Sequence, residues 1–274
     1  MPRHTAAVFD IDGTLALMDK TTNTFTALPG ALDALAYCRT NGITPVAYTN
    51  GTFFPPAHYY PLLAEAGITF DEGHILTPAH VAAQRLKAMG YSRVMVLGGD
   101  GTTVPCTEAG LEVIKPTADA PPVEAVLMGY TRDFNAEQLE AVIQAVWNGA
   151  KPFAGSKAPF FAGAKGRTLG ISGALSAAVE YTTGQEVALF GKPSTEGLAM
   201  VTDLTGTQPE DMIVIGDDPN LEIRMGRSAG SLCIGVTTGI SDTAAFNSSP
   251  EAERAHHVLP SLETFPALLD TLTN

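Results

Sequence analysis

The chain has 274 residues, of which 45% are hydrophobic and 16% are charged, so it can form one large domain or two smaller ones. Its 29 acidic and 16 basic residues give a formal charge of −13, and the basic residues are scattered along the chain. This pattern excludes a nucleic-acid-binding protein from the expected classes. It also means that a phosphate site needs a local cation, either a metal ion or a well-placed lysine.

The sequence shows no export signal and no membrane segment. No basic N-terminal segment leads into an apolar run, and no stretch approaches the roughly 20 apolar residues that a membrane-spanning helix requires. Cys38, Cys106 and Cys233 lack the paired spacing of zinc ligands or redox dithiols. We therefore expect a soluble, cytoplasmic protein with buried, reduced thiols and no membrane partner.

Short apolar runs that end in polar residues predict buried parallel strands. The first run covers residues 6–9 and stops at Asp10, and the second covers residues 43–48 and stops at Thr49. Further runs of this kind are Val94–Leu97, Leu111–Ile114, Ala125–Met128, Val187–Phe190, Met212–Ile215 and Leu232–Val236. Because parallel strands joined by crossovers share one edge for their carboxyl ends, the loops after them should converge.

Helical patterns separate several of these strands. The helix expected before the second strand places Leu32, Leu35 and Ala36 on one apolar face. The clearest helix covers residues 136–147 and is amphipathic, so Trp147 is expected in the core rather than in a binding site. The alternation of strands and helices predicts an α/β fold built from βαβ units.

The loops after the strands divide the chain into two parts. Those that follow residues 9, 48, 190 and 215 carry Asp, Thr, Asn, Lys and Asp, whereas the loops in the middle of the chain carry no such set. We therefore predict a core domain formed by residues 1–77 and 188–274. Residues 78–187 are expected to form a second α/β domain inserted into it.

The first of these loops contains two carboxylates. Asp10 and Asp12 lie two residues apart at a strand end, so their side chains project in the same direction. Phosphoryl transfer needs an in-line nucleophile, neutralisation of the phosphate oxygens and a proton for the leaving oxygen. Asp10 is the expected nucleophile, which would form an aspartyl phosphate, and Asp12 is the expected general acid and base. Gly13 allows the backbone to approach the phosphate closely.

Three other loops supply the remaining parts of a phosphate site. Thr49 and Asn50 offer a hydroxyl and an amide donor to a phosphoryl oxygen. Lys192 supplies a compact positive charge on a stiff Gly-Lys-Pro loop. The acidic pair Asp217 and Asp218 forms, with the nucleophile, an oxygen-rich site suited to Mg²⁺.

In this order, the four segments resemble the four motifs of the haloacid dehalogenase (HAD) superfamily: Asp10–Thr14, Thr49–Asn50, Gly191–Pro193 and Gly216–Asp218. The long insertion between the second and third segments resembles the cap domain of the NagD-like, p-nitrophenylphosphatase branch. The resemblance implies a Rossmann-like core with a parallel sheet, an inserted α/β cap that contacts the substrate, and a homodimer formed through the cap. It also implies that Mg²⁺ is bound by the side chains of Asp10 and Asp217 and by the backbone carbonyl of Asp12.

Two segments depart from the family pattern. Family members usually have a second Asp five residues after the metal-binding Asp, where this chain has Glu222. Either Glu222 or Asp218 is expected to orient a metal-bound water, and a surface ion pair of Glu222 with Arg224 or Arg227 is nearly as good an interpretation. The cap usually carries Thr-Asn-x-Asp where this chain has Ala154–Lys157, so the substrate preference stays open.

The predicted function is Mg²⁺-dependent hydrolysis of a small phosphate monoester, such as a sugar, polyol or nucleotide monophosphate. A phosphomutase or another phosphotransferase could use the same aspartyl phosphate. A phosphate-binding regulator without turnover is the alternative from another class, although it would have no use for both Asp10 and Asp12. A NAD-dependent oxidoreductase is disfavoured because residues 163–173 lack the Gly-x-Gly-x-x-Gly spacing.

Overall fold

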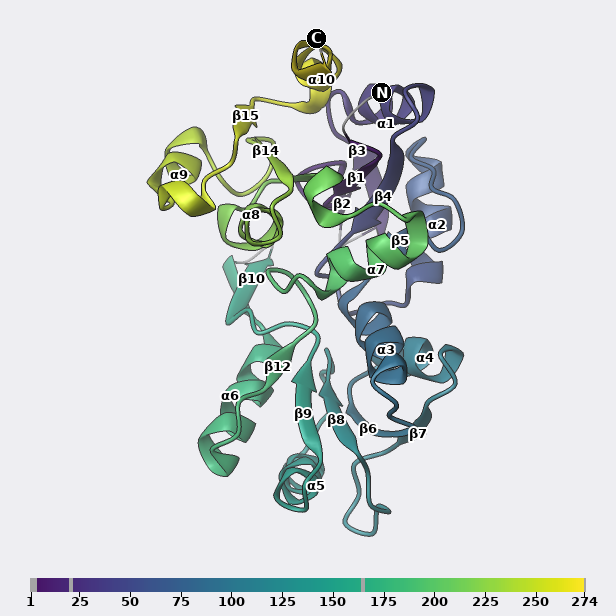
Figure 1. The fold of residues 1–274 in the computed structure, drawn as a ribbon. Helices are drawn as coiled ribbons and strands as arrows, with labels where there is room; N and C mark the ends of the chain where they lie inside the picture. Colours follow the sequence, from purple (N-terminus) through teal and green to yellow (C-terminus); the bar gives the residue numbers. More distant parts are fainter. Residues whose placement is uncertain (1–3, 20–21, 164–165, 274) are drawn as a thin grey trace. The chain divides into compact units, whose positions relative to one another are not determined.

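The computed structural model describes residues 4–19, 22–163 and 166–273, and the chain divides into two compact units (Figure 1). The first unit comprises Met1–Thr49, Ala57–Leu76 and Lys192–Asn274, and the second comprises Asn50–Pro56 and Thr77–Gly191. The segment 50–56 and residues 188–191 thus group with the middle of the chain, whereas the sequence prediction has them in the core domain. The assignment of the two units as catalytic core and cap stays a prediction.

A parallel sheet with the strand order β15-β14-β13-β1-β4-β5 lies at the centre of the first unit. Its strands are β1 (Ala6–Phe9), β4 (Thr44–Tyr48), β5 (Ile75–Leu76), β13 (Met212–Gly216), β14 (Leu232–Val236) and β15 (His257–Leu259). β1 pairs with β13 on one side and with β4 on the other, and its whole length is buried. The apolar runs predict β1, β4, β13 and β14 correctly because a sheet covered on both faces selects apolar residues. The two short edge strands β5 and β15 were not predicted.

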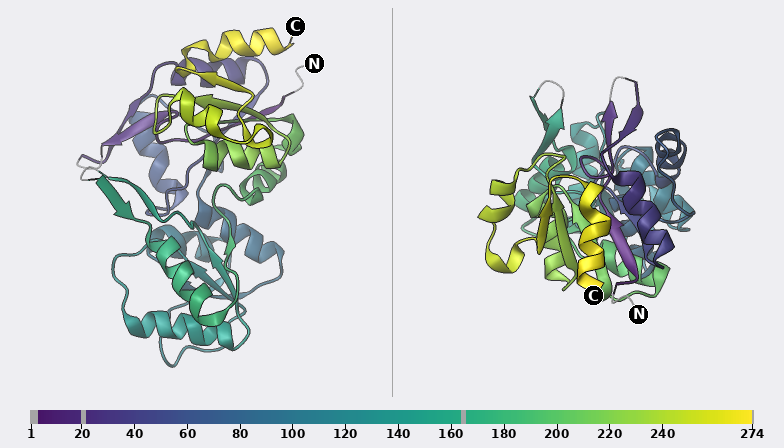
Figure 2. Two further views of the ribbon diagram at one scale, coloured as in Figure 1. Left: turned by 90° about the vertical axis from the view of Figure 1, so that its left-hand side faces the viewer. Right: turned by 90° about the horizontal axis from the view of Figure 1, so that it is seen from above.

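Helices and one hairpin complete the first unit. The helices are α1 (Ala31–Thr40), α2 (Pro56–Glu65), α7 (Glu196–Thr205), α8 (Arg224–Ser228), α9 (Thr243–Ser248) and α10 (Phe265–Thr273), and the hairpin joins β2 (Ala16–Asp19) to β3 (Thr24–Ala27). Shorter helical turns cover Pro209–Asp211, Pro219–Ile223, Glu251–Glu253 and Leu262–Thr264. α10 lies beside α1 (Figure 2), where Phe265 contacts both Phe9 and Tyr37.

The buried face of α1 differs from the predicted one. The buried residues have the spacing i, i+3, i+4 and i+7 and are Ala31, Ala34, Leu35 and Cys38. Leu32 is 46% exposed and Ala36 is also exposed. Leu32 is rotated by about 100° from the preceding residue, and this rotation takes it off the face that packs on the sheet. The prediction for Leu35 is therefore confirmed, and those for Leu32 and Ala36 are wrong.

The second unit contains another parallel sheet, with the strand order β12-β9-β8-β6-β7 (Figure 1). Its strands are β6 (Arg93–Leu97), β7 (Glu112–Ile114), β8 (Ala125–Met128), β9 (Lys151–Ala154) and β12 (Ala188–Leu189). Its helices are α3 (Pro78–Ala88), α4 (Asp100–Glu108), α5 (Ala136–Trp147) and α6 (Ile171–Thr183), and β10 (Phe160–Gly163) and β11 (Gly166–Leu169) form a separate hairpin. The α/β prediction is thus confirmed in both units.

Two sequence predictions in the second unit need correction. The strand expected at residues 187–190 was placed at the same sheet edge as Asp10, but β12 pairs with β9 in the second sheet. Trp147 was expected in the core, but it is 54% exposed. It is the last residue of α5 and is rotated by about 100° from the fully buried Val146, so it points away from the core.

Glycines follow the strands of the second sheet at its carboxyl edge. Gly98 follows β6, Gly129 follows β8 and Gly155 follows β9. A Cβ atom on Gly129 would lie 1.8 Å from the hydroxyl oxygen of Thr102, and one on Gly98 would lie 2.8 Å from it. A Cβ atom on Gly155 would lie 3.2 Å from the methyl carbon of Thr52. Open α/β sheets commonly bind ligands at this edge, and here threonine side chains of the protein pack closely against its glycines.

The cysteines are buried, as the sequence predicts. All three cysteines are buried and free, and burial raises the pKa of each thiol to about 12, so they are unreactive near neutral pH. In the described part of the chain, no helix has both the length and the apolar composition that a membrane span requires.

Candidate active site

The candidate nucleophile follows the central strand of the first sheet. Asp10 is 7% exposed, and its N–H donates to the carbonyl of Ile215 in β13 at 2.9 Å. The strand pairing therefore continues into the loop and holds the backbone of this residue in place. Gly13 has a φ of +87°, a left-handed conformation that favours glycine, and its N–H donates to the carbonyl of Ala16 at 2.9 Å.

The ammonium group of Lys192 is buried between two carboxylates. Its Nζ contacts Oδ1 of Asp10, pairs with Oε1 of Glu222 at 2.6 Å and donates to the carbonyl of Tyr48 at 2.8 Å. The lysine side chain is only 1% exposed. Lys192 is therefore not a solvated loop residue, and it reaches Asp10 although it enters the first unit directly from β12 of the second.

Glu222 belongs to the same buried cluster. It stands five residues after Asp217 and is 2% exposed. The π-helical turn Pro219–Ile223 directs it inward, where its Oε2 accepts the N–H of Asp218 at 3.1 Å. One carboxylate thus connects the acidic loop to Lys192.

The alternative interpretation of Glu222 as a member of a surface ion pair is wrong. Arg224 Nε lies 3.8 Å from the carboxylate of Glu253, and Arg227 Nε donates to the carbonyl of Ala252 at 3.0 Å. Both arginines therefore have their own partners near the surface. Glu222 instead points inward and pairs with Lys192, because a buried ammonium group is destabilised unless negatively charged groups compensate it.

Asp218 has a local structural contact. Its Oδ1 accepts the N–H of Asn220 at 2.8 Å and caps the turn that follows. Burial raises its pKa, and the hydrogen bond from Asn220 opposes this shift. Of the two candidates for a supporting role, Glu222 is the one that contacts Lys192.

Asp217 follows β13, and its carboxylate is held by the loop after β14, which the sequence interpretation did not single out. Its Oδ2 accepts the N–H of Ile240 at 2.8 Å, and the hydroxyl of Thr238 donates to the carbonyl of Gly13 at 2.6 Å. The loop Thr237–Ile240 thus contacts two of the predicted segments. Its signal in the sequence is the apolar run Leu232–Val236, which ends in Thr-Thr-Gly, the same combination of hydroxyl and glycine as in the second segment.

Burial and crowding raise the pKa values of the acidic groups. Burial raises the pKa of Asp217 to about 7; the Glu222 carboxylate adds to this shift, while the Ile240 N–H and Lys192 oppose it. The pKa of Asp10 is also raised, mainly by burial, and the ammonium of Lys192 opposes this shift. Burial alone lowers the pKa of Lys192, but the two carboxylates that it contacts outweigh burial and raise it. Lys192 therefore stays protonated near neutral pH.

The donor set suits a small divalent cation. Buried carboxyl groups outnumber the ammonium of Lys192, and the raised pKa of Asp217 indicates a charged form that lacks full compensation. Among the described residues, no three His, Cys, Asp or Glu side chains form a ready metal site. A site with the carboxylates of Asp10 and Asp217 and the backbone carbonyl of Asp12 needs only two such side chains. These hard oxygen donors are the kind that Mg²⁺ prefers, so the residues present fit this ion.

The structure places the other predicted residues as follows. Asp12 is exposed, and Thr49 is 2% exposed at the end of β4. Burial raises the pKa of Tyr59, and the carboxylates of Asp12 and Asp10 add to this shift, so both lie near the same phenol. Asn50 groups with the second unit and Thr49 with the first, so the division between the units falls inside the second predicted segment.

Lys157, in the segment that departs from the family pattern, has a structural contact in the second unit. Its Nζ pairs with Oε1 of Glu180 at 2.6 Å and donates to the carbonyl of Val187 at 3.1 Å. The same Glu180 oxygen accepts the N–H of Val187 at 2.9 Å. Lys157 therefore joins the end of β9 to α6 and to the start of β12.

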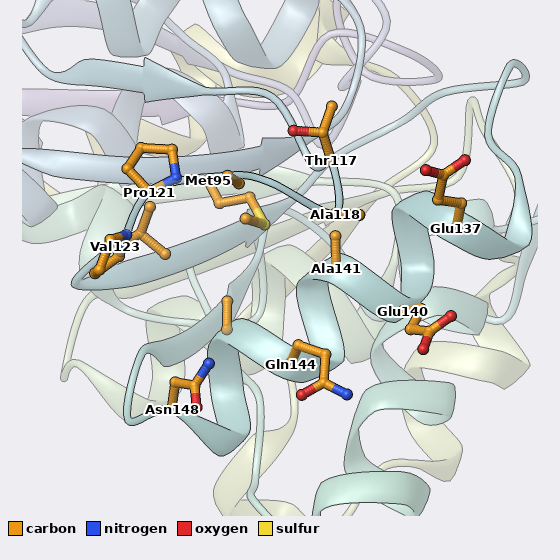
Figure 3. Close-up of a pocket in the computed structure, with 13 residues that line it drawn as sticks. Met95, Thr117, Ala118, Pro121, Val123, Glu137, Glu140, Ala141, Gln144 and Asn148 are labelled. Carbon is orange, nitrogen blue, oxygen red and sulfur yellow. The ribbon is translucent and has the colours of Figure 1, made fainter.

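A groove of about 520 Å³ in the second unit has a different character (Figure 3). It lies between α5 and residues 117–123, and its lining includes the carboxylates of Glu137 and Glu140 together with apolar side chains such as Met95 and Val123. Its lining contains no Lys, Arg or His. Because a phosphate needs a cation, this groove does not suit a phosphate ester.

Two family models match the chain over the regions that carry the site. A haloacid dehalogenase-like hydrolase family matches residues 7–112, and a HAD-hydrolase-like family matches residues 189–265. The first range contains Asp10 and Thr49, and the second contains Lys192 and Asp217.

The chain is also similar to characterised proteins and to solved structures. It is 27% identical over 236 residues to a dihydroxyacetone phosphatase of Corynebacterium glutamicum, covering 86% of this chain and 83% of that protein. The structure of NagD from Escherichia coli matches with a TM-score of 0.81 at 24% identity, covering 95% of this chain and 97% of NagD. The glycerol phosphate phosphatase Rv1692 of Mycobacterium tuberculosis, in complex with magnesium, matches with a TM-score of 0.83 at 21% identity, covering 97% and 78%. The two structural likenesses concern the fold.

Proposed function

Because the chain belongs to the haloacid dehalogenase-like hydrolases and is a phosphatase with the fold of NagD, we propose that it hydrolyses small organic phosphate monoesters through an aspartyl phosphate on Asp10. The observation that carries this proposal is the contact between the buried ammonium of Lys192 and the buried carboxylate of Asp10. Burial without compensation would favour the protonated carboxyl group. The lysine opposes this, so it favours the ionised form that a nucleophile needs.

The first step transfers the phosphoryl group to the protein. A carboxylate oxygen of Asp10 attacks phosphorus in line with the ester oxygen, so a P–O bond to Asp10 forms while the ester P–O bond breaks. Asp12 donates a proton to the departing oxygen, and the alcohol leaves. The exposure of Asp12 suits this role, since its partner is a group of the substrate.

The second step releases inorganic phosphate. Asp12, now ionised, takes a proton from the water that attacks phosphorus, and the bond between phosphorus and Asp10 breaks. Asp10 returns to the carboxylate and Asp12 to the acid. One ester and one water are consumed, and one alcohol and one phosphate are produced.

The remaining residues of the site bind the phosphoryl oxygens. Lys192 supplies positive charge, Thr49 and Asn50 supply a hydroxyl and an amide, and the backbone at Gly13 supplies N–H donors. Glu222 pairs with the ammonium of Lys192 at 2.6 Å while Lys192 also contacts Asp10, so the charge of the lysine is shared between two carboxylates.

We assign Mg²⁺ to the carboxylates of Asp10 and Asp217 and to the backbone carbonyl of Asp12. When bound, this ion neutralises negative charge on the phosphoryl group in transfer. The proposal is supported by the excess of buried carboxyl groups and by the magnesium complex of the structurally similar Rv1692. Removal of the metal by a chelator is expected to abolish turnover.

The substrate class is a small phosphorylated metabolite. The similar proteins are named for dihydroxyacetone phosphate and glycerol phosphate, which supports polyol and sugar phosphates, with nucleotide monophosphates as further candidates. We further assign the second unit, predicted as residues 78–187, as the cap that selects the substrate. A homodimer is expected, and light scattering of the purified protein tests it.

Release of phosphate from a panel of these esters, with Mg²⁺, tests the proposed function. Asp10→Asn is expected to fold and to lose at least about 10³-fold in kcat, because the nucleophile is gone. Unchanged turnover in this variant would remove the mechanism. Transfer of the phosphoryl group to another alcohol without free phosphate would indicate a phosphotransferase, and binding without turnover would indicate a regulator.

A further inference from the structure

The loop Thr237–Ile240 lies beside the acidic loop because the two strands that precede them are neighbours. β14 pairs in parallel with β13, with Gly235 opposite Gly216. Both strands therefore end at the same edge of the sheet, and the residues that follow them leave it side by side. The chain from Thr237 onward is thus brought next to Asp217.

Thr238 holds one peptide group of the nucleophile loop. Its hydroxyl donates to the carbonyl of Gly13 at 2.6 Å, across 225 residues of sequence. Gly13 has a positive φ, and a glycine backbone can take several conformations at little cost. The Asp12 carbonyl belongs to the peptide whose N–H donates from Gly13 to the carbonyl of Ala16, and Thr238 adds a hydrogen bond to the next peptide, so Gly13 is held on both sides.

Gly239 packs directly against the carboxylate of Asp217. A Cβ atom on Gly239 would lie 1.8 Å from Oδ2 of Asp217, and one on Gly13 would lie 2.5 Å from the same oxygen. The carboxylate therefore lies between two glycine backbones. The N–H of Ile240 donates to Oδ2 at 2.8 Å, so one loop sets both the position and the rotation of this side chain.

We propose that Thr238 and Gly239 are positioning residues for the Mg²⁺ site. They act through the backbone of Gly13 and the carboxylate of Asp217, and in this role they touch neither the substrate nor the phosphorus. Residues that orient metal ligands commonly change metal affinity or activity by about 10- to 100-fold when they are replaced. The inference rests on the proposed function, since it takes Asp10, Asp12 and Asp217 as the ligands.

The test is a titration of the full-length protein with Mg²⁺, without substrate, followed by the shift of its thermal unfolding midpoint. Thr238→Val keeps the shape of the side chain and removes the donor, and it is expected to raise the half-saturating Mg²⁺ concentration about 10- to 100-fold. Thr238→Ser keeps the hydroxyl and is expected to stay close to wild type. In phosphatase assays, Thr238→Val should recover much of its kcat at high Mg²⁺, a recovery that a general loss of structure would not show.

Thr237→Val is the matched control, because the hydroxyl of Thr237 donates to the carbonyl of Pro260 and not into the site. It is expected to bind Mg²⁺ as wild type does. Gly239→Ala provides a second variant if Thr238→Val does not fold, and it is expected to lose the Mg²⁺ shift because its methyl group displaces Asp217. Wild-type Mg²⁺ affinity in both Thr238→Val and Gly239→Ala would overturn this inference alone. A wild-type protein with neither a Mg²⁺ shift nor phosphate release would instead contradict the proposed function.

Discussion

The two parallel sheets of this protein have carboxyl edges of opposite character. At the edge of the first sheet, β1, β4 and β13 lead directly into Asp10, Thr49 and Asp217. At the edge of the second, β6 and β8 lead into glycines on which a threonine side chain packs. Two parallel sheets thus give a buried charged cluster at one edge and glycines packed against a threonine side chain at the other. A sheet edge becomes a candidate site through its residues and not through its topology.

Two lysines show the same difference. Lys192 is 1% exposed and contacts the candidate nucleophile and Glu222, whereas Lys157 is 32% exposed and pairs with Glu180 alone among carboxylates in the described chain. The first pair is buried, so loss of the lysine leaves carboxylates uncompensated. The side chains of the second pair are about one-third exposed, so its contribution to stability is small.

Apart from the loss of Asp10, replacement of Lys192 should reduce phosphatase activity the most among the substitutions considered, whereas replacement of Lys157 should leave it almost unchanged. Lys192→Met is expected to lower kcat/KM by about 10²- to 10³-fold, because one cation that stabilises the transferring phosphoryl group is lost. Lys157→Met is the matched control and is expected to keep its kcat, with a loss of unfolding free energy of about 0.5 kcal/mol. Phosphate release and chemical denaturation measure the two outcomes. Equal losses of activity in both variants would contradict the conclusion that only Lys192 belongs to the active site.

Asp217→Asn should weaken Mg²⁺ binding and, at the same time, stabilise the metal-free protein. The pKa of Asp217 is raised from 3.8 to about 7, so the metal-free folded protein loses stability as the pH rises from about 4 to about 7. Above pH 7, the metal-free variant is expected to be more stable than wild type by on the order of 1–3 kcal/mol, and near pH 4 the two should be equal. The variant should also lose the stabilisation by Mg²⁺. Denaturation with a chelator and with Mg²⁺, at both pH values, checks these signs.

Glu222→Gln should have a smaller effect on turnover. The amide keeps the size of the side chain and one acceptor but removes a charge from beside Lys192, so the lysine charge is no longer shared with a second carboxylate and acts more fully on Asp10. We expect a loss in kcat of about tenfold, the cost of disturbing a group that supports a catalytic residue. Steady-state kinetics measure it. An unchanged kcat would show that the contact of Glu222 with Lys192 serves the fold alone.

Gly129→Ala, at the edge of the second sheet, should have the smallest effect on kcat and a clear effect on stability. The new methyl group would overlap the hydroxyl of Thr102, which costs about 1–3 kcal/mol of unfolding free energy. The double variant Gly129→Ala with Thr102→Ala removes the overlapping group and is expected to recover most of this loss. A double-mutant cycle in denaturant tests the coupling, and additive losses would contradict the packing argument.

The sequence by itself determined the longest buried strands, such as β1, β4 and β13, and it singled out the four polar segments. Buried parallel strands are apolar at every position, and a run that stops at Asp10 or Thr49 is a local signal that no distant contact alters. The α/β class and the set Asp10, Asp12, Lys192 and Asp217 follow from such signals.

Only the tertiary structure decided which side chains meet. Glu222 could face solvent or Lys192, and the sequence did not choose between these positions, because the choice depends on a turn packed against β13. β12 could belong to either sheet, and each of its residues pairs with one 35 positions earlier in the chain. The contact of Thr238 with Gly13 spans 225 residues. Such contacts depend on how strands and loops pack on one another, and this packing cannot be predicted from a local pattern of residues.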